Sequence, residues 1–371
     1  MKIVGLMSGT SLDGVDAALL EADGETIARF GAGLETPFLE PERDVLQQAV
    51  RAALQWRFNG PEPEIFQSAE IVLTQTHARA VRSVCKQERI KPSELDLVGF
   101  HGQTVVHVPP VDGQLGRTCQ IGNGQALANE LNCPVAYDFR SHDMENGGQG
   151  APLAPIYHQL LVQSSGLPRP LGVLNIGGVA NLTLLNRDGT IQAFDTGPGN
   201  GLMDAWTLEK TGNSMDANGE LAARGRVHDQ TLADLLAHPH FKIQGPKSLD
   251  RWDFSLDHAR NLSVEDGLAT LSAFTAMAIS DGFKWVNEPP QMLVAAGGGR
   301  KNTELLRRIA EVCAVPVLTA EQVGWRGDLI EAEAFAVLAA RCLNAQPISF
   351  PGTTGVATPL TGGQLAYPSV S

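Results

Sequence analysis

Hydrophobic and polar positions follow the same order in two parts of the chain. In each part, a short apolar run is followed by a glycine-containing loop, a second run, a tight turn and a third run. The runs of the first part are residues 2–7, 15–23 and 26–34, and those of the second part are residues 171–176, 179–185 and 190–195. Short apolar runs bounded by turn residues are typical of β-strands. We therefore predict two copies of one three-stranded unit, which is the pattern of an internal duplication.

Much of the remaining chain has the 3.6-residue apolar period of helices. The predicted helices are 40–56, 64–87, 201–210, 229–237, 265–286, 302–313 and 329–343, and two further buried strands begin at Leu95 and Gln291. Alternating strands and helices predict an α/β fold. We expect two similar lobes with a cleft between them, residues 1–138 and 139–371, and the helix near 328–344 packing back on the first lobe. The tail from about residue 347 is expected to be a surface loop or an extended arm.

Composition and charge narrow the function classes. The 371 residues carry a net charge of −13 and no basic run, which argues against broad electrostatic binding to nucleic acid. The five cysteines are scattered without CxxC spacing, so neither a disulfide framework nor a zinc site is expected. The N-terminus does not read as a signal peptide, and no segment approaches the roughly 20 apolar residues of a membrane span. We therefore expect a soluble cytoplasmic protein with reduced thiols.

Four glycine-rich loops follow apolar runs. They are SGTSLDGVD at residues 8–16, NIGG at 175–178, DTGPGN at 195–200 and AAGGGRKN at 295–302. Glycine lets backbone N–H groups approach a ligand closely, and a loop that leads into a helix adds a favourable dipole. One such loop is weak evidence, but four of them indicate phosphates held between two lobes. The P-loop, Rossmann and protein-kinase motifs are absent from the sequence.

The order of these loops resembles that of the actin/hexokinase/Hsp70 nucleotide-binding superfamily. Within it, the chain is similar to the anhydro-N-acetylmuramic acid kinase family over nearly its whole length. The motifs that carry the resemblance are GLMSGTSLDGVD (5–16), HGQTVVH (101–107), DFR (138–140), GGQGAPL (147–153), LNIGG (174–178), FDTGPGNGLMDAW (194–206), GPKS (245–248) and GGGRKN (297–302). The resemblance implies two actin-like (ribonuclease H-like) lobes around a nucleotide cleft. It also implies a kinase of peptidoglycan recycling that hydrolyses the 1,6-anhydro ring of anhydro-N-acetylmuramic acid and phosphorylates O6, using ATP and Mg²⁺.

The resemblance assigns the nucleotide to three of the loops. The implied ATP-binding residues are Gly9, Thr10, Ser11, Leu12, Asp13, Gly14, Val15, Asp16, Asn175, Gly177, Gly178, Gly297, Gly298 and Gly299. On the residues alone, the first loop can also be read as a simple strand–turn–strand with an Asp-Gly turn. Related kinases carry an Asp at the end of the first strand, where Met7 and Ser8 stand here. Asp13 and Asp195 are therefore the candidates for the carboxylate that orients magnesium.

Asp195 is the candidate catalytic residue. On the residues alone, it can be a turn or cap residue, a metal ligand, or a base at the end of a strand. The resemblance favours the base, because sugar kinases of the superfamily place a catalytic Asp near this point. Water that attacks the anomeric carbon needs a base, whereas the γ-phosphate of ATP can capture O6. One carboxylate then suffices where a glycosidase uses two.

Polar side chains in other motifs are candidate sugar contacts. The implied substrate-binding residues are His101, Gln103, Thr104, Arg140, Gln149 and Glu331. His101 can also be read as a structural histidine, and Glu331 as a solvated helix start. Arg140 is a candidate partner for the lactyl carboxylate through a bidentate fork, or else it forms a salt bridge with Asp138 or Asp143. Lys247 meets a phosphate or lies on the surface.

Two other functions are compatible with the same fold. An ordinary sugar kinase would phosphorylate a free hydroxyl, and an ATP-switched chaperone or filament subunit would need a partner surface or an appended domain. The two lobes use up nearly the whole chain, which counts against the second alternative. The expected partners are ATP and the anhydro amino sugar, with no nucleic acid and no membrane, and the family resemblance suggests a homodimer.

Overall fold

The computed structural model describes residues 1–9, 11–111, 113–243, 245–247, 249 and 253–369. The chain folds into two compact units, Met1–Leu160 with Leu329–Ser371, and Leu161–Asp328. This division differs from the expected boundary at residue 138. Residues 139–160 and the whole C-terminal segment belong with the first unit, because they pack against its sheet and loops.

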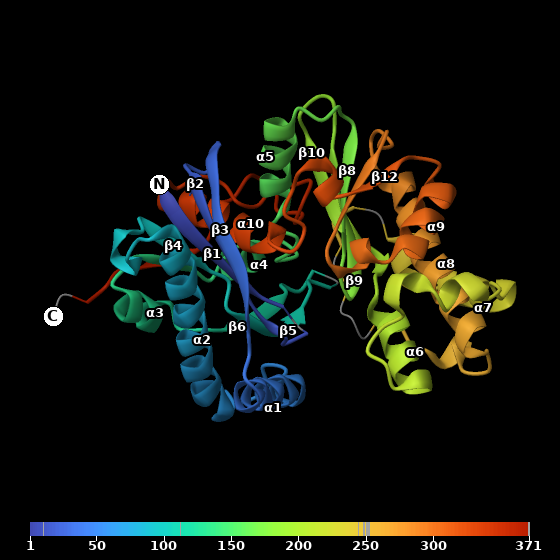
Figure 1. Cartoon of the computed structure of the whole chain (residues 1–371), viewed down its shortest axis with the longest axis horizontal. Helices are drawn as coiled ribbons and strands as arrows, with labels where there is room; N and C mark the ends of the chain where they lie inside the picture. Colours follow the sequence, from blue (N-terminus) through green and yellow to red (C-terminus); the bar gives the residue numbers. More distant parts are fainter. Residues whose placement is uncertain (10, 112, 244, 248, 250–252, 370–371) are drawn as a thin grey trace. The chain divides into compact units, whose positions relative to one another are not determined.

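The first unit is built on a mixed sheet (Figure 1). Its strands, in spatial order, are β13 (Gln364–Ala366), β7 (Val135–Tyr137), β4 (Leu97–Phe100), β1 (Lys2–Ser8), β2 (Gly14–Ala22) and β3 (Ile27–Pro37). The first three strands along the chain form an antiparallel meander, while β4 runs parallel to β1 and β7 runs parallel to β4. A separate hairpin joins β5 (Gln103–Val108) to β6 (Arg117–Ile121).

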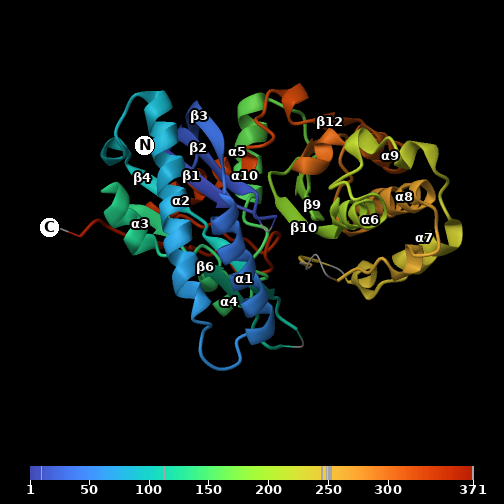
Figure 2. The same ribbon diagram turned by 60° about the horizontal axis from the view of Figure 1, so that its bottom comes forward.

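Helices cover both faces of this sheet. The helices of the first unit are α1 (Glu40–Trp56), α2 (Ile65–Glu88), α3 (Gly124–Leu131), α4 (Ser141–Glu145) and α10 (Ile330–Leu343), and α5 (Pro155–Ser165) crosses the boundary between the units. Figure 2 shows α1 and α2 on one side of the sheet. Apolar residues of both helices belong to the core of this unit. On the other face, α10 packs against β1, β2 and β4.

Two paired glycines let α10 approach the sheet closely. Gly5 of β1 lies beside Gly99 of β4 in the parallel register. A Cβ added at Gly5 would lie 1.9 Å from the carbonyl oxygen of Ala332, and one at Gly99 would lie 2.2 Å from that of Phe335. Any side chain at either position would therefore push the helix away from the sheet.

The second unit repeats the strand order of the first. Its strands are β10 (Ile191–Pro198), β9 (Val179–Leu185), β8 (Leu171–Ile176), β11 (Leu293–Ala296) and β12 (Val317–Thr319), in that spatial order. Again three strands form an antiparallel meander, and β11 and β12 extend the sheet in parallel from β8. The predicted α/β fold is therefore confirmed, and both units carry the repeated strand plan.

The second unit has a core of its own. Its helices are α6 (Gly201–Thr211), α7 (Asp229–Leu236), α8 (Val264–Gly282) and α9 (Thr303–Cys313). The central helix α8 is buried along most of its length and contacts α6, α7, α9 and β10. The 3₁₀ turns η2 (Ala217–Gly219), η3 (Ala222–Arg224), η7 (Gly298–Lys301) and η8 (Glu321–Val323) connect these elements.

The C-terminal tail differs from the expected surface loop. Ile348, Ser349, Thr354 and Val356 are buried, and β13 pairs with β7 at the edge of the first sheet. The tail therefore belongs to the packed structure of the first unit. No helix in the described part of the chain is both long and apolar enough to cross a membrane.

Candidate functional site

Two glycine-rich loops of the second unit are joined through their backbones. The N–H group of Gly199 donates to the carbonyl oxygen of Gly178 at 3.0 Å, and that of Asn200 donates to Gly177 at 2.7 Å. The N–H group of Gly201 also donates to Gly178, at 3.3 Å. These loops follow β8 and β10, so the N-terminus of α6, which begins at Gly201, lies against the loop after β8. Its first N–H groups make this a favourable place for an anion.

Some of the glycines in this region are required for packing between loops. A Cβ at Gly199 would lie 2.1 Å from the carbonyl oxygen of Gly177. Gly297, after β11, has φ +71°, and a Cβ there would lie 2.4 Å from Oδ1 of Asn175. The loops after β8, β10 and β11 therefore meet at close quarters, which brings the predicted second phosphate loop together with the predicted adenosine loop.

Two other glycines leave open space. A Cβ at Gly178 would have no neighbour within 4 Å, and one at Gly298 would meet only Nδ2 of Asn200, at 3.7 Å. Both glycines are exposed. Among the glycines of these loops, Gly178 and Gly298 therefore have backbones that a ligand can approach closely.

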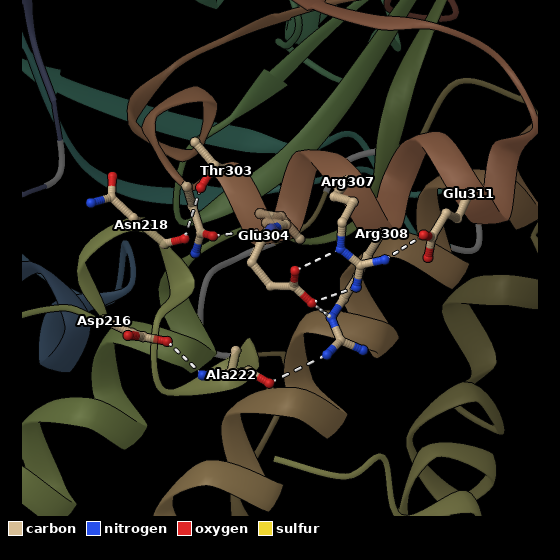
Figure 3. A network of polar contacts seen from close by, with 10 residues as sticks. Asp216, Asn218, Ala222, Thr303, Glu304, Arg307, Arg308 and Glu311 are labelled. Carbon is tan, nitrogen blue, oxygen red and sulfur yellow. Dashed lines mark hydrogen bonds and ion pairs between the residues drawn. The ribbon is translucent and has the colours of Figure 1, made fainter. Parts of the chain in front are cut away.

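The start of α9, directly after the adenosine loop, is held by a polar network (Figure 3). Oδ1 of Asn302 caps the helix by accepting from the N–H group of Leu305 at 3.0 Å. The network joins Thr303 to Asn218, Glu304 to Arg307 and Arg308, Arg307 to Glu311, Arg308 to Ala222, and Ala222 to Asp216. These contacts fix the N-terminus of α9 against the segment that contains η2 and η3.

Asp195 lies at a β-bulge in β10. The pairing with β9 shifts register between Asp195 and Gly197, and the strand continues to Pro198, beyond the end predicted from the sequence. Oδ2 of Asp195 accepts a hydrogen bond from the N–H group of Leu249 at 2.7 Å, and its own N–H group donates to the carbonyl oxygen of Lys247 at 2.9 Å. This carboxylate is therefore bonded to a segment 54 residues away along the chain.

A buried histidine and a buried lysine support the backbone at Asp195. Nε2 of His240 donates to the carbonyl oxygen of Asp195 at 3.0 Å, and burial together with Lys247 lowers the pKa of His240 to about 4. Nζ of Lys247 donates to the carbonyl oxygens of His240 and Ile243. Burial lowers the pKa of Lys247 to about 8, against the opposing effect of Asp281 and Asp195. Lys247 is 7% exposed, so it does not lie on the surface.

The first glycine loop, after β1, is tied down by a side chain of β5. Nε2 of Gln103 donates to the carbonyl oxygen of Gly9 at 3.2 Å. Gln103 is only 1% exposed, and this amide nitrogen holds the loop from inside the unit. Within the loop, Oδ1 of Asp13 accepts from Oγ of Ser11 at 2.8 Å and from the N–H group of Gly14 at 3.0 Å.

The other residues of the predicted ATP loop are distributed between the loop and β2. Leu12 is buried and has φ +56°, whereas Val15 and Asp16 lie inside β2. Thr10 lies outside the described residues. A Cβ at Gly14 would lie 2.7 Å from the carbonyl oxygen of Thr36, so this glycine has a packing role.

His101 and Arg140 form a pair in the first unit. Nδ1 of His101 donates to the carbonyl oxygen of Gly102 at 2.8 Å, and Nε2 accepts from Nε of Arg140 at 3.1 Å. Burial, and after it the Arg140 guanidinium, holds the pKa of His101 well below its usual range. His101 is therefore neutral and orients Arg140.

The two carboxylates considered as partners of Arg140 have other bonds. Asp138 accepts from Oγ of Ser141 at 2.5 Å and from Nε2 of Gln364 at 2.9 Å. Asp143, 1% exposed, accepts from the N–H group of Gly150 and from Oγ1 of Thr354, each at 2.6 Å. Asp143 thus holds the GGQG loop against the C-terminal tail.

The remaining candidate sugar residues are spread over the first unit. The N–H group of Gln149 donates to the carbonyl oxygen of Thr354 at 2.7 Å, and Oγ1 of Thr104 accepts from Nε2 of Gln120 at 3.2 Å. Glu331 is exposed in the first turn of α10. A hollow of about 220 Å³ at the carboxyl ends of β4 and β7 is lined in part by His101, Gln120, Tyr137, Asp138 and Ser141.

The family model for anhydro-N-acetylmuramic acid kinase matches residues 1–368. The chain belongs to this family. It is 50% identical over 368 residues to the anhydro-N-acetylmuramic acid kinase of Phenylobacterium zucineum (strain HLK1), covering 99% of this chain and 100% of the relative. It is 48% identical over 365 residues to the enzyme of the same name from Caulobacter vibrioides (strain ATCC 19089 / CIP 103742 / CB 15), covering 98% of each chain.

Solved structures of other proteins are similar to this member of the anhydro-N-acetylmuramic acid kinase family at 12–13% identity. Component A of the (R)-2-hydroxyglutaryl-CoA dehydratase of Acidaminococcus fermentans has a TM-score of 0.48 and covers 92% of this chain and 98% of its own. A ROK family glucokinase from Streptomyces griseus, solved with glucose and AMPPNP, has a TM-score of 0.43. The match covers 92% of this chain and 100% of the glucokinase chain.

The anhydro-N-acetylmuramic acid kinase motifs of this chain include carboxylates that fit a magnesium–nucleotide complex. In the described residues, no group of three or more His, Cys, Asp or Glu side chains is placed to hold a metal ion. Mg²⁺ in nucleotide sites is ordinarily bound through one or two carboxylates and the substrate phosphates. Asp13, exposed in the first loop, and Asp195, partly exposed at the bulge, are compatible with that kind of site.

Several supporting residues in this family member were missed by sequence reasoning. His240 contacts Asp195 and Thr354 contacts Gln149, both far away along the chain, and no short motif marks those contacts. Asp143 joins the nearby Gly150 to the distant Thr354. For Asp143, its place four residues before the GGQG run was the available signal.

Proposed function

We propose that this chain opens the 1,6-anhydro ring of anhydro-N-acetylmuramic acid with water and transfers the γ-phosphoryl group of ATP to O6. The products are N-acetylmuramic acid 6-phosphate and ADP, and the reaction serves peptidoglycan recycling. The observation that carries the proposal is the family match over residues 1–368. Relatives of this name that are 48–50% identical over 98–99% of the chain support it.

The proposed reaction consumes one water and one ATP. The water oxygen attacks C1 of the sugar while its proton passes to Asp195, and the bond between C1 and O6 breaks. The electron pair left on O6 attacks the γ-phosphorus, and the bond from that phosphorus to the bridging oxygen of ADP breaks. Because the phosphoryl group captures O6, no second carboxylate is needed to protonate the leaving oxygen, as it would be in a glycosidase.

We assign the base to Asp195 because of how its carboxylate is held. The Leu249 N–H group donates to Oδ2, and the bulge in β10 sets the direction of the side chain. His240, neutral at physiological pH, holds the carbonyl oxygen of the same residue. A base fixed by the backbone in this manner needs little reorganisation to accept a proton.

We assign the nucleotide to the loops that leave backbone exposed. Gly178 and Gly298 have room for a ligand, and the adjoining N-terminus of α6 favours phosphate. The first loop, with Gly9, Ser11 and Asp13, supplies further N–H and hydroxyl groups. Mg²⁺, held by Asp13 or Asp195, would neutralise charge on the phosphoryl oxygens.

We assign the sugar to the first unit. Arg140, oriented by His101, is a donor for the lactyl carboxylate. Gln103, Thr104, Gln149 and the exposed Glu331 are the further proposed contacts, and Gln103 also holds the first loop through Gly9.

We extend the proposal to a homodimer in the cytoplasm. The dimer comes from the family resemblance, and the location comes from the composition of the sequence. The mass of the purified protein in solution tests the dimer, and fractionation of cells tests the location.

Turnover in ¹⁸O-labelled water tests the function. The full-length protein is incubated with the anhydro sugar, ATP and MgCl₂, and the product is analysed by mass spectrometry. We expect one ¹⁸O at C1 and phosphate on an unlabelled O6. A blank in which unlabelled product stands in labelled water corrects for exchange at C1. Phosphate on a free hydroxyl with the anhydro ring intact would identify an ordinary sugar kinase, and absence of ADP release with the anhydro sugar would exclude the proposal.

A further inference from the structure

The side chain of Arg300 is buried directly behind the adenosine loop. It belongs to the 3₁₀ turn η7, and only 3% of the side chain is exposed. Nη1 donates to the carbonyl oxygen of Gly297 at 2.9 Å, Nε donates to Oε1 of Glu321 at 2.8 Å, and Nη2 donates to Oδ2 of Asp328 at 2.8 Å. The guanidinium therefore joins three segments of the second unit: the loop after β11, the turn η8 after β12, and the last residue of the unit.

This arrangement uses the geometry that distinguishes arginine from lysine. The planar guanidinium presents several N–H groups in fixed directions, while an ammonium group is a single charged point on a flexible stem. The side chains of its two carboxylate partners are largely exposed, 52% for Glu321 and 64% for Asp328. The Arg300 guanidinium is therefore the buried group of this ion-pair network. A Cβ at Gly327 would lie 2.2 Å from Nε of Arg300, so the chain before Asp328 packs directly on the guanidinium.

Arg300 fixes the backbone that carries the exposed glycine. Gly297 has φ +71° and ψ 177°, a conformation that favours glycine, and its carbonyl oxygen also accepts from the N–H group of Arg300 at 3.3 Å. The direction of this carbonyl sets the orientation of the next peptide, which is that of Gly298. Gly298 is the position in the turn with open space on its Cα.

Asp328 also marks a boundary in the chain. It is the last residue of the second unit, and Leu329 and α10 belong to the first. Its carboxylate is bound by two side chains of η7, because Nζ of Lys301 donates to Oδ1 at 2.9 Å while Arg300 holds Oδ2. The adenosine loop is thus bonded to the segment through which the chain leaves the unit.

We propose that Arg300 is a positioning residue for the nucleotide: it holds the Gly297–Gly298 turn in the conformation that receives ATP and ties this turn to the segment ending at Asp328. The inference rests on the proposed function, because it takes the turn to be the adenosine site. Arg300 acts through Gly297 and contacts no reacting atom. Its loss should therefore weaken nucleotide binding without slowing the chemical step.

The test compares Arg300→Lys with the wild-type protein. The dissociation constant for a non-hydrolysable ATP analogue is measured by calorimetry without sugar, and kcat and the KM for the anhydro sugar are measured separately. We expect the dissociation constant to rise about tenfold, which corresponds to the loss of one or two charge-assisted hydrogen bonds. We expect kcat and the sugar KM to stay within about twofold. Lys301→Met is the matched control, because Lys301 also binds Asp328 but its side chain is 66% exposed.

A second variant keeps the test decisive if Arg300→Lys does not fold. Glu321→Gln combined with Asp328→Asn removes both anionic partners and leaves the guanidinium in place. A wild-type dissociation constant in either folded variant, or a fall in kcat as large as the rise in the dissociation constant, would overturn the inference. Failure of the proposed function has a different signature: a wild-type protein that binds the ATP analogue and does not release ADP with the anhydro sugar.

Discussion

Hydrogen bonds to rigid partners hold the side chains that matter most for the proposed chemistry. The carboxylate of Asp195 accepts from the backbone N–H group of Leu249, and the guanidinium of Arg140 donates to a ring nitrogen of His101. In both cases the partner is buried or belongs to the backbone, so the direction of the functional group is set before substrate arrives. Because these groups are already oriented, little conformational freedom is lost when the substrate binds.

At this scale the first prediction concerns Asp195→Asn. The amide oxygen can still accept from Leu249, so the local structure should be retained while the base is lost. General base catalysis contributes about 10²- to 10⁴-fold to the rate. We therefore expect the turnover rate of the anhydro sugar to decrease by at least about 10²-fold. The affinity for ATP should stay within about twofold, because the loops at Gly178 and Gly298 are unchanged. ADP release and calorimetry measure the two quantities.

The exposed pair of Asp257 and Arg260 offers a control. Asp257→Asn removes a carboxylate of the same size, far along the chain from the loops of the site, and should leave both turnover and ATP affinity as in the wild type. Wild-type turnover in Asp195→Asn would remove Asp195 from the role of base.

Some residue-level features could be predicted and others could not. The candidates Asp195 and Arg140 come from motifs that carry the family resemblance, and their roles stay predictions. The bond between Asp143 and Thr354 spans 211 residues, and the place of Gln103 behind Gly9 depends on how β5 crosses the first loop. Contacts of this kind follow from the tertiary arrangement and leave no local pattern.

At the scale of elements, the loops of the second unit are held together by glycines of two kinds. Gly199 is enclosed by the backbone of the neighbouring loop, whereas Gly178 borders open space. Neither glycine has the positive φ that would by itself exclude alanine. The two positions therefore separate a packing role from a binding role within one pair of loops.

The corresponding prediction compares Gly199→Ala with Gly178→Ala. A Cβ at position 199 would lie 2.1 Å from the carbonyl oxygen of Gly177, so the loops must move apart. We expect a loss of about 1–3 kcal/mol in the free energy of unfolding, as for other overpacked sites. Gly178→Ala should change the free energy of unfolding by less than about 0.5 kcal/mol, as surface substitutions usually do, and should weaken ATP binding.

Urea unfolding and calorimetry decide between these outcomes. If Gly178→Ala bound ATP as tightly as the wild-type protein, the loop after β8 would not approach the nucleotide. Equal stability of the two variants would contradict the packing role of Gly199.

Elements with a clear apolar pattern were predictable, and short polar ones were not. The two strand meanders follow from short apolar runs such as β8, and the helices follow from an apolar period that is strong in α1 and α9. The hairpin of β5 and β6 carries many polar side chains, and β13 has only three residues, so these strands are stabilised by their partners. The sequence therefore predicted the main strands of each sheet but not the short strands at the edges.

On the scale of the whole molecule, buried histidines make stability sensitive to acid. Burial lowers the pKa of His77 from 6.5 to about 4, with the carbonyl oxygen of Leu73 acting in the opposite direction, and it lowers the pKa of His158 to about 4 as well. The folded chain therefore keeps these rings neutral at pH values where the unfolded chain protonates them. Below about pH 6.5 the unfolded state binds more protons, so the free energy of unfolding must fall as the pH falls.

The last prediction is that His77→Phe reduces this acid sensitivity. The lowering of the His77 pKa from 6.5 to about 4 corresponds to about 3 kcal/mol, which the wild-type protein should lose progressively between pH 6.5 and pH 4 through His77 alone. Phenylalanine keeps a ring of similar size against Phe100 but cannot take up a proton, so the free energy of unfolding should depend less steeply on pH. Leu73→Val, another fully buried change in α2, should lower stability by a similar amount at every pH. Urea unfolding at pH 7, 6, 5 and 4.5 gives the slopes, and an unchanged slope in His77→Phe would show that His77 does not contribute to the acid sensitivity.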